Sequence, residues 1–369
     1  MTVLTFTHLF PCFRLKLAQS LGANSKVWFM KIKTLAQATI AALALSGAAL
    51  FSSTATAADI DFTKLEHRVT DSSAPVVYFT SDISPEGLQA AYEALGRVPS
   101  GKVAFKLSTG EAGNDNHLDP DLIKNLVQQF DGTIVECNTA YGGSRSSTLA
   151  HRQVIKDHGF DAIAQVDIMD EEGSMEIPVT GGEHLKFDRV GSHLANYDFM
   201  VVLTHFKGHA MGGFGGALKN ISIGVASQEG KNLIHTAGHT DKFEWGAYGP
   251  IDTPEHVDFI ESMAEAADAV SDHFDHGQKI LYISVMNNMS VDCDCDGSPA
   301  PVDMHDIGIL ASLDPVALDQ ACVDLVYQAP DGDSLIERME SRQGPHILDH
   351  AVKMGLGQKS YQLVSLDQK

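Results

Sequence analysis

The sequence predicts an α/β fold, with a mainly parallel sheet sandwiched by helices in one large domain that is either undivided or arranged as two lobes. Short apolar runs alternate with longer amphipathic segments along most of the 369 residues. Polar, glycine-bearing loops follow the apolar runs, as they do at the carboxyl ends of parallel strands. No internal repeat, low-complexity tract or linker rich in Pro, Gly and Ser interrupts this alternation.

The individual elements follow from local signals. Two helices have recognisable starts, because Ser84 and Asp119 each precede a proline at the first helical position. The expected strands are residues 76–80, 102–107, 133–137, 163–168, 199–203, 279–285, 307–311 and 361–364. The expected helices are residues 85–95, 120–130, 147–158, 255–274, 315–327 and 346–354.

The N-terminus has the three-part pattern of a secretory signal peptide. A basic start at residues 30–33 precedes an apolar run at residues 40–51, and small residues at 55–57 precede Ala58. The apolar run is too short to span a membrane stably. No twin-arginine pair accompanies it, and no cysteine at the cleavage point offers a lipid anchor. This pattern predicts export of an unfolded chain.

Residues 1–29 precede this pattern and have no part in it, so we expect translation to begin at Met30. Residues 30–57 are then a signal peptide, and residues 58–369 form a single mature α/β domain. The expected location is periplasmic or secreted.

The mature chain is strongly acidic. Residues 1–57 contain five Lys and Arg and no Asp or Glu, so the rest of the chain has 21 basic and 48 acidic side chains and a formal charge of −27. Such a surface repels nucleic acid and anionic lipid, so we expect no nucleic-acid partner and no membrane partner after cleavage. A small anionic partner would need a local basic pocket. The sequence leaves the oligomeric state open.

One stretch in the middle of the chain concentrates the most chemistry. The expected strand at 199–203 leads into His205, Lys207 and His209, and a glycine-rich turn at 212–216 follows. Glycines let the backbone approach a ligand closely, and the N–H groups of the helix expected after the turn attract anions. Solvated side chains beside an ordinary turn are the alternative. The number of imidazole and ammonium groups favours a site for a carboxylate, a phosphate or a metal.

Four polar loops follow strands, and the predicted sheet brings them to one edge. These loops are residues 109–117, 138–147, 205–216 and 287–297. We expect acid–base chemistry from His205, Lys207 and His209. The expected anion-binding residues are Arg145, Gly213, Gly215, Gly216, Lys219 and Lys231.

The mature chain retains four cysteines, which is too few for a disulfide scaffold. Cys137 and Cys322 lie in apolar stretches and are expected in the core. Cys293 and Cys295 are expected as thiols, because cysteines separated by one residue rarely bridge without strain. They would bind a transition metal together with His235, or serve redox chemistry; zinc, copper and nickel suit thiolate and imidazole ligands.

Histidines recur at a spacing of four residues, in the pairs His205 and His209 and His235 and His239. On a helix, side chains at this spacing share a face and can chelate a metal. Hydrogen bonds to nearby backbone are an equally good interpretation.

A set of short motifs between residues 76 and 364 is specific when taken together. It comprises Lys106, Gly110-Glu111, Asn138-Thr139, Tyr141-Gly142-Gly143-Ser144-Arg145, His151, Thr204-His205-Phe206-Lys207-Gly208-His209, Gly213-Phe214-Gly215-Gly216-Ala217-Leu218-Lys219-Asn220, Gly230-Lys231, His235, Asp292-Cys293-Asp294-Cys295 and Ser312-Leu313-Asp314-Pro315-Val316-Ala317-Leu318-Asp319. With these motifs the chain resembles the uncharacterised "Fe–S centre" protein family, domain of unknown function 362. The resemblance implies a fold and a candidate site rather than a reaction.

The chain departs from that family in one respect. Many members carry a ferredoxin-like insert with Cys-x-x-Cys-x-x-Cys spacing, which the four mature cysteines here do not form. Export without a twin-arginine signal also argues against a cluster, because clusters are assembled in the cytoplasm. We therefore expect no iron–sulfur cluster, and a transition metal is the cofactor that remains open.

A shorter resemblance is to lactate racemase, whose active-site loop joins a histidine segment to a Gly-Phe-x-Gly-Gly turn with a nearby lysine. The matching residues are His209, residues 213–216 and Lys219. By analogy alone, this suggests chemistry at a hydroxy acid assisted by histidines and a nickel-bearing cofactor.

Two functions follow from the sequence. The first is an exported enzyme that acts on a small anionic metabolite, with metal-assisted acid–base or redox chemistry. The second is a periplasmic metal- or ligand-binding protein without turnover, which would use the same residues.

Overall fold

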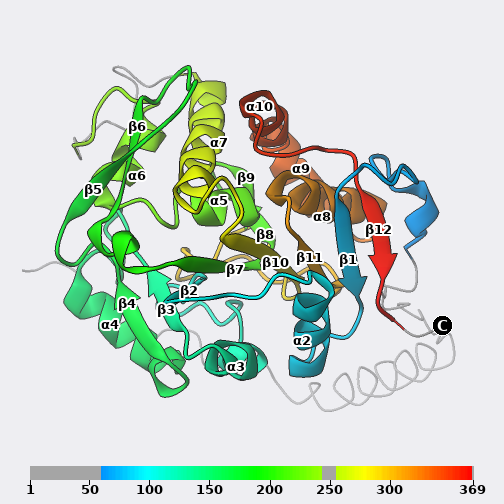
Figure 1. Cartoon of the computed structure of the whole chain (residues 1–369), viewed down its shortest axis with the longest axis horizontal. Helices are drawn as coiled ribbons and strands as arrows, with labels where there is room; N and C mark the ends of the chain where they lie inside the picture. The colour runs from blue at the N-terminus through cyan, green and yellow to red at the C-terminus, as the bar shows by residue number, and fades with distance from the viewer. Residues whose placement is uncertain (1–59, 243–254, 368–369) are drawn as a thin grey trace, which may run out of the picture. The chain divides into compact units, whose positions relative to one another are not determined.

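The computed structural model describes residues 60–242 and 255–367. Its main sheet has eight strands, in the order β12 (Gln362–Ser365), β1 (Val76–Thr80), β11 (Gly308–Ser312), β10 (Ile280–Met286), β7 (Phe199–His205), β2 (Val103–Lys106), β3 (Thr133–Glu136) and β4 (Gln165–Ile168) (Figure 1). Neighbouring strands pair in parallel except at β11, which is antiparallel to both β1 and β10. The predicted α/β class with a mainly parallel sheet is confirmed.

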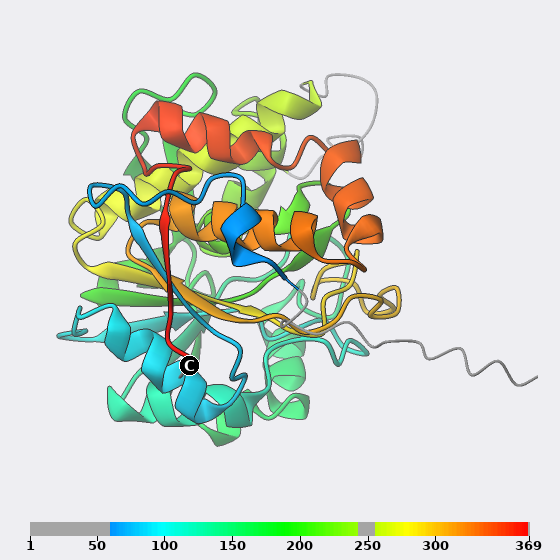
Figure 2. The same cartoon turned by 90° about the vertical axis from the view of Figure 1, so that its right-hand side faces the viewer.

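Helices cover both faces of this sheet (Figure 2). One face carries α2 (Pro85–Ala94), α3 (Pro120–Gln129) and α4 (Thr148–Asp157). The other carries α5 (Ala217–Ile221), α7 (His256–His273), α8 (Pro315–Gln328) and α10 (His346–Met354). The remaining elements are α6 (Gln228–His235), α9 (Asp333–Ser341), the 3-10 turns Phe62–Lys64, Phe160–Ala162 and Ser192–Asn196, and the pairs β5 (Ser174–Pro178) with β6 (Phe187–Gly191) and β8 (Lys207–His209) with β9 (Gly213–Gly215).

The alternation of side chains along a strand divides the core into two layers. On β2, Val103 and Phe105 pack in the cluster that contains residues of α2 and α3, whereas Ala104 packs in the cluster on the opposite face. Lys106 continues the Ala104 side and is 1% exposed at the carboxyl end of the strand. A charged side chain is thereby placed at the end of an otherwise apolar strand.

All the strands and helices expected from the sequence are present among the described residues, with ends that differ by at most two residues. The expected caps are also confirmed, because Ser84 Oγ accepts a hydrogen bond from Gly87 N at 3.1 Å and Asp119 Oδ1 accepts one from Asp121 N at 2.8 Å. The pair β5–β6 and helices α6 and α9 were not predicted. β5 has only two apolar side chains, Met175 and Ile177, in alternation with exposed residues, which is a weak signal for a strand.

The described residues fall within one compact unit. None of the helices that the structure describes is both long enough and apolar enough to cross a lipid bilayer. The expected start at Met30 and the signal peptide at residues 30–57 lie outside the described residues.

Candidate functional site

A cavity of about 530 Å³ lies where β2, β3 and β7 end. The loops after these strands form its walls, together with the loop after β10 and the start of α5. Ligands bind at this position in open α/β sheets, because the carboxyl ends of parallel strands meet there. Its volume suits a small molecule.

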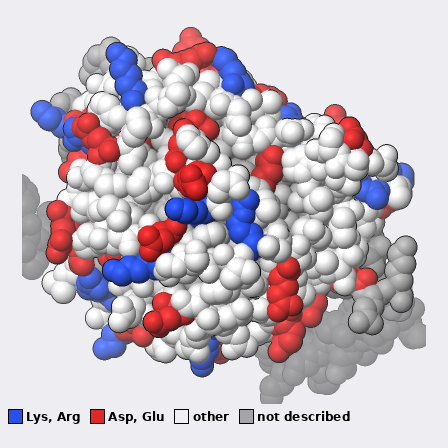
Figure 3. All heavy atoms as spheres, viewed as in Figure 1, with Lys and Arg blue, Asp and Glu red and all other residues white. Residues whose placement is uncertain are grey.

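The cavity is markedly more basic than the protein around it. Its lining contains the basic residues Lys106, Arg145, Lys207, Lys219 and Lys231 but only two acidic ones, Glu136 and Asp294. The whole chain has a formal charge of −22. On the face shown in Figure 3, basic and acidic side chains are interspersed. The concentration of basic groups therefore distinguishes the cavity from that surface.

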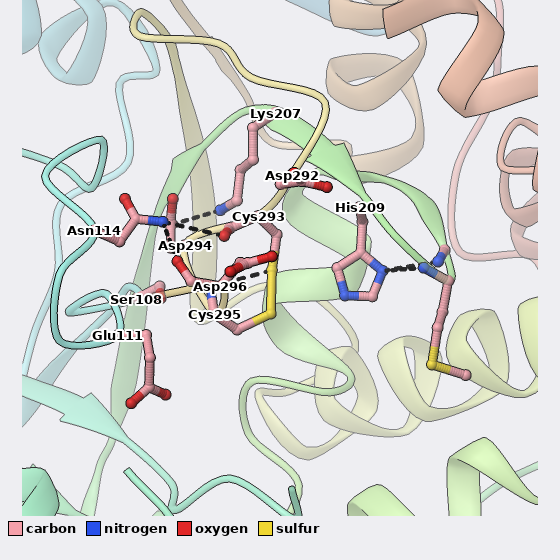
Figure 4. Close-up of a disulfide and its surroundings, with 12 residues drawn as sticks. Ser108, Glu111, Asn114, Lys207, His209, Asp292, Cys293, Asp294, Cys295 and Asp296 are labelled. Atoms are coloured by element: carbon pink, nitrogen blue, oxygen red, sulfur yellow. Dashed lines mark hydrogen bonds and ion pairs between the residues drawn. A yellow bond between two sulfur atoms is a disulfide. The ribbon is translucent and has the colours of Figure 1, made fainter. Parts of the chain in front are cut away.

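Asp294 binds two of the expected catalytic residues. Its Oδ2 accepts a hydrogen bond from Lys207 Nζ at 2.7 Å (Figure 4), and its Oδ1 lies 2.7 Å from His205 Nδ1. Burial alone would raise the pKa of Asp294, but the charges of Lys207 and His205 hold it far below its usual range. His205 Nε2 lies 2.7 Å from the carbonyl oxygen of Asn287. Both ring nitrogens of His205 thus face acceptors within the protein.

Arg145 is also bound to groups of the protein itself. Its Nη1 donates to Glu136 Oε1 at 3.1 Å, its Nη2 donates to the Tyr141 hydroxyl at 3.3 Å, and its Nε lies 3.5 Å from Glu111 Oε2. Burial would raise the pKa of Glu136, but the charge of Arg145 and the hydrogen bond with His151 lower it well below its usual range. The guanidinium group of Arg145, which we expected to bind a ligand, is therefore directed at Glu136.

Lys219 differs from the other basic groups of the cavity. Lys106 and Lys231 donate to backbone carbonyls, and Lys207 is paired with Asp294. Among the residues that the structure describes, the Lys219 ammonium has no hydrogen-bond or ion-pair partner. Burial, followed by repulsion from Lys207, lowers the pKa of Lys219 to about 7.

A second unpartnered group lines the same cavity. Thr139 is 5% exposed, and its hydroxyl has no hydrogen-bond partner in the described part of the chain. Buried polar groups in folded proteins are normally hydrogen-bonded. Thr139 and Lys219 therefore leave two polar groups for a ligand to satisfy.

His209 has a defined tautomer. Its Nδ1 accepts hydrogen bonds from Gly212 N at 2.7 Å and Met211 N at 3.2 Å, so the hydrogen of the neutral ring is on Nε2. Burial, together with the charge of Lys219, lowers the pKa of His209 well below its usual value. In Figure 4 the other ring nitrogen lies on the side of the disulfide. His209 therefore presents a neutral N–H donor on the side where the Cys293–Cys295 disulfide lies.

The glycine-rich segment differs from the expected strand–helix turn. Residues 213–215 form β9, which pairs with β8, and the helix that follows has only five residues. Its first amides, Ala217 N and Leu218 N, donate to the Asp319 carboxylate at 2.7 and 3.0 Å. A carboxylate does bind this helix start, but it belongs to the protein. The expectation that these amides hold a ligand is therefore wrong.

The glycines of this segment serve close packing. A Cβ on Gly215 would lie 3.2 Å from Lys207 Cε and 3.7 Å from Lys219 Cδ. Gly215 and Gly216 line the cavity, whereas Gly213 does not; a Cβ on Gly213 would lie 2.8 Å from Gly344 Cα. Gly213, expected to bind an anion, instead contacts the segment before α10.

The histidine pairs do not chelate through a shared helix face. His205 and His209 lie on strands, and α6 ends at His235, before His239. The His235 ring lines the cavity and stacks on Phe259, with ring centroids 4.8 Å apart. Burial lowers the pKa of His235 to about 4, although Nδ1 also lies 2.6 Å from Lys231 O. His235 is therefore neutral at physiological pH.

The structure differs from the expectation of free thiols at Cys293 and Cys295, because these residues form a disulfide that lines the cavity. Ligand atoms of His209 and the two cysteines lie within 4.8 Å of one another, but His235 is not in that group. A disulfide offers no thiolate to a metal, and the protonated Nε2 of His209 offers no lone pair. Cys137 and Cys322 are buried free cysteines, as expected.

The structure thus brings most of the expected site residues into one cavity. Sequence reasoning assigned no site role to Glu136 or Thr139, and it did not anticipate the bond between Asp319 and α5. Glu136 stands at the end of a buried strand, where a charged side chain is a usable signal. Asp319 is 102 residues from Ala217, so no local pattern could identify it.

Two solved structures resemble this fold at low similarity. The lactate racemase apoprotein from Thermoanaerobacterium thermosaccharolyticum aligns with 14% identity and a TM-score of 0.39, over 69% of this chain and 57% of that one. A protein from Thermotoga maritima aligns with 12% identity and a TM-score of 0.37, over 73% of this chain and 58% of that one. This chain therefore spans less than two thirds of either length, and such scores carry no information about its activity.

No curated protein matches the chain. A family profile does match it, over residues 103–324, which is more than half of its length. The matched region includes the ends of β2, β3, β7 and β10 and the loops around the cavity. The chain belongs to the family described as a domain of unknown function, DUF362.

Proposed function

We propose that this protein is an exported enzyme that acts on a small metabolite carrying a carboxylate or a phosphate, bound in the cavity beside Lys219. The observation that supports this most directly is the Lys219 ammonium, which lines a basic cavity without a partner among the described residues. In a chain with a formal charge of −22, an ammonium that is partly buried without a counter-ion needs a reason to be there. An anionic ligand supplies that reason.

The residues around the cavity would divide the work. Lys219 pairs with the anion and takes up a proton on binding, because the negative charge of the ligand raises its pKa from about 7. His209 donates from Nε2 to an oxygen on which negative charge develops, as neutral donors do in oxyanion sites. Asp294 binds both Lys207 and His205. These two residues therefore hold the wall of the cavity in place and do not transfer protons.

Ligand binding tests the first half of the proposal. Isothermal titration calorimetry of the mature protein against small carboxylates and phosphates should identify at least one ligand. Lys219→Ala should weaken its binding by about 1.5–3 kcal/mol, the range for a charged hydrogen bond, with little change in melting temperature. Lys124→Ala, an exposed lysine on α3, is the matched control and should bind normally. Failure of Lys219→Ala to weaken binding would contradict the proposal.

Turnover of the bound ligand tests the second half. The alternative is a ligand-binding protein without turnover, and it is favoured by the occupation of His205, Lys207 and Arg145 by partners within the protein. Ligands identified by calorimetry should be incubated with the protein and followed by mass spectrometry and chiral chromatography. Binding without any chemical change would establish the alternative.

Export has its own test. The basic, apolar and small-residue pattern of residues 30–57 is what supports export. N-terminal sequencing of the protein recovered from its host should begin at Ala58 or within a residue or two of it. A mature chain that retains Met30 would contradict the export proposal.

A further inference from the structure

We infer that the Cys293–Cys295 disulfide is a redox-active group, which accepts two electrons from a small anionic dithiol that enters the cavity. The inference rests on the proposed function only for the preference for an anionic reductant. The disulfide belongs to the loop after β10 and lines the cavity; His209 lies beside it (Figure 4). It is therefore placed where a small molecule would bind.

A structural role explains this disulfide poorly. Its cysteines are two positions apart, and a loop this short restricts the unfolded chain little. The loop is also held without it. Asn114 Nδ2 donates to Cys293 O at 3.2 Å, Glu111 N donates to Asp294 O at 2.7 Å, and the Tyr141 hydroxyl donates to Cys295 O at 3.1 Å. These bonds hold the loop from two other loops, residues 109–117 and 138–147, so the loop keeps its shape when the sulfurs separate.

The two sulfurs have different surroundings. Cys293 is 5% exposed, whereas Cys295 is half-buried and more accessible. Cys293 Sγ accepts a hydrogen bond from Cys295 N at 3.2 Å, and the N–H of His209 lies on the side of the disulfide. Hydrogen-bond donors and positive charge stabilise a thiolate. Cys295 is thus the sulfur open to attack, and Cys293 is the better leaving group.

The exchange is balanced with a dithiol as the only co-reactant. A thiolate of the dithiol attacks Cys295 Sγ, the bond between Cys295 and Cys293 breaks, and Cys293 leaves as a thiolate. The second sulfur of the dithiol then attacks its own first sulfur in the mixed disulfide and releases Cys295. The dithiol becomes a cyclic disulfide, and its two protons pass to Cys293 and Cys295.

Dihydrolipoate and its neutral amide, dihydrolipoamide, are a matched pair of probes that differ in one negative charge. Each is mixed with the native, oxidised protein, thiols are blocked with iodoacetamide, and peptide mass spectrometry locates the alkylated cysteines. We expect both Cys293 and Cys295 to be alkylated without unfolding. Reduction by dihydrolipoate should be about tenfold faster than reduction by the amide, because the cavity is basic.

Single cysteine variants show which of the two sulfurs is attacked in the exchange. With glutathione disulfide, Cys293→Ser should form a mixed disulfide at Cys295 at least about tenfold faster than Cys295→Ser forms one at Cys293. Cys322→Ser removes a buried cysteine of α8 and should leave the exchange rate unchanged.

The outcomes separate the two proposals. If Cys293 and Cys295 are alkylated only after unfolding, the redox inference is overturned whatever the calorimetry shows. If both dithiols reduce the native protein at the same rate, the disulfide is redox-active, but the preference for an anion is wrong. If dihydrolipoate and dihydrolipoamide reduce Lys219→Ala at equal rates, the preference for an anionic reductant depends on the Lys219 side chain in the cavity.

Discussion

Lys207 and Lys219 both lie close to Gly215, yet only Lys207 has a counter-ion among the described residues. Asp294 neutralises Lys207 at 2.7 Å, and Lys219 is left partly buried beside another cation. Removing a charge from water without a partner is costly, so the protein shifts the pKa of Lys219 to about 7. An anionic ligand would relieve this cost, which is why the affinity for it should depend on pH.

The pH dependence of binding has a definite sign. Below about pH 6, Lys219 is protonated in the free protein, and the affinity for a carboxylate should be constant. Above about pH 7 the free protein has lost that proton and must regain it on binding, so the dissociation constant should rise by about tenfold per pH unit. Calorimetry at several pH values measures this, and Lys219→Ala should show a flat profile. An affinity that increases with pH would contradict the role of Lys219.

The tautomer of His209 leads to a separate prediction. Because its donor is a neutral N–H, His209→Ala should lower the turnover number by about 10²–10³-fold, the effect of removing one oxyanion donor, and leave ligand affinity nearly unchanged. Steady-state kinetics and calorimetry on the same preparation separate these effects. His209→Ala that binds poorly and turns over normally would show that His209 holds the ligand instead.

Among the structural elements, α5 depends on a distant carboxylate. It has five residues, too few to be stable alone, and its start lies against Asp319 of α8. A Cβ on Gly216 would lie 2.5 Å from Asp319 Cγ, so the glycine allows this approach. Because α5 carries Lys219, the position of the candidate ligand-binding group depends on the contact between α5 and α8.

Removal of the Asp319 carboxylate should therefore destabilise the protein. Asp319→Ala leaves two buried amides without an acceptor, and we expect it to lower the free energy of unfolding by about 2–4 kcal/mol. Asp319→Asn keeps one acceptor and should cost less. Urea denaturation followed by circular dichroism measures both variants. Equal stabilities of Asp319→Ala and the wild type would show that α5 does not need this cap.

At the scale of the whole molecule, the layers of the fold separate charge from the apolar core, but a few ionisable groups remain buried. Asp188 of β6 is fully buried, and burial raises its pKa to about 7. The folded state therefore retains a proton that the unfolded chain releases near the ordinary aspartate pKa of 3.8. Between these values the folded state binds more protons, so this contribution to stability is lost as the pH rises through about 7.

Asp188→Asn tests this effect because asparagine does not ionise. Relative to the wild type, the melting temperature of the variant should be higher at pH 8 than at pH 5, by about 2 °C or more. Differential scanning calorimetry at the two pH values provides the comparison. If the difference in melting temperature between variant and wild type is the same at pH 5 and pH 8, Asp188 has the same protonation state at both pH values.

Local patterns in the sequence suffice to predict the fold class and the position of the candidate site along the chain. Strands and helices are encoded by the local spacing of apolar residues and by caps such as Ser84 and Asp119, and these signals do not depend on distant partners. The order of strands and helices then placed the polar loops at one sheet edge. Lys207, His209 and Lys219 were identified because charged and imidazole groups follow an apolar strand directly.

Which of these groups are available to a ligand depends on contacts between distant parts of the chain. Asp294 is 89 residues from His205, and Asp319 is 102 residues from Ala217, so the partners that occupy His205 and the start of α5 leave no trace in the local sequence. Likewise, the spacing of Cys293 and Cys295 predicts two thiols, whereas the folded loop joins their sulfurs in a disulfide. Local patterns specify where polar groups are placed along the chain. Only the fold specifies which opposite charges meet, and so which group remains for a ligand.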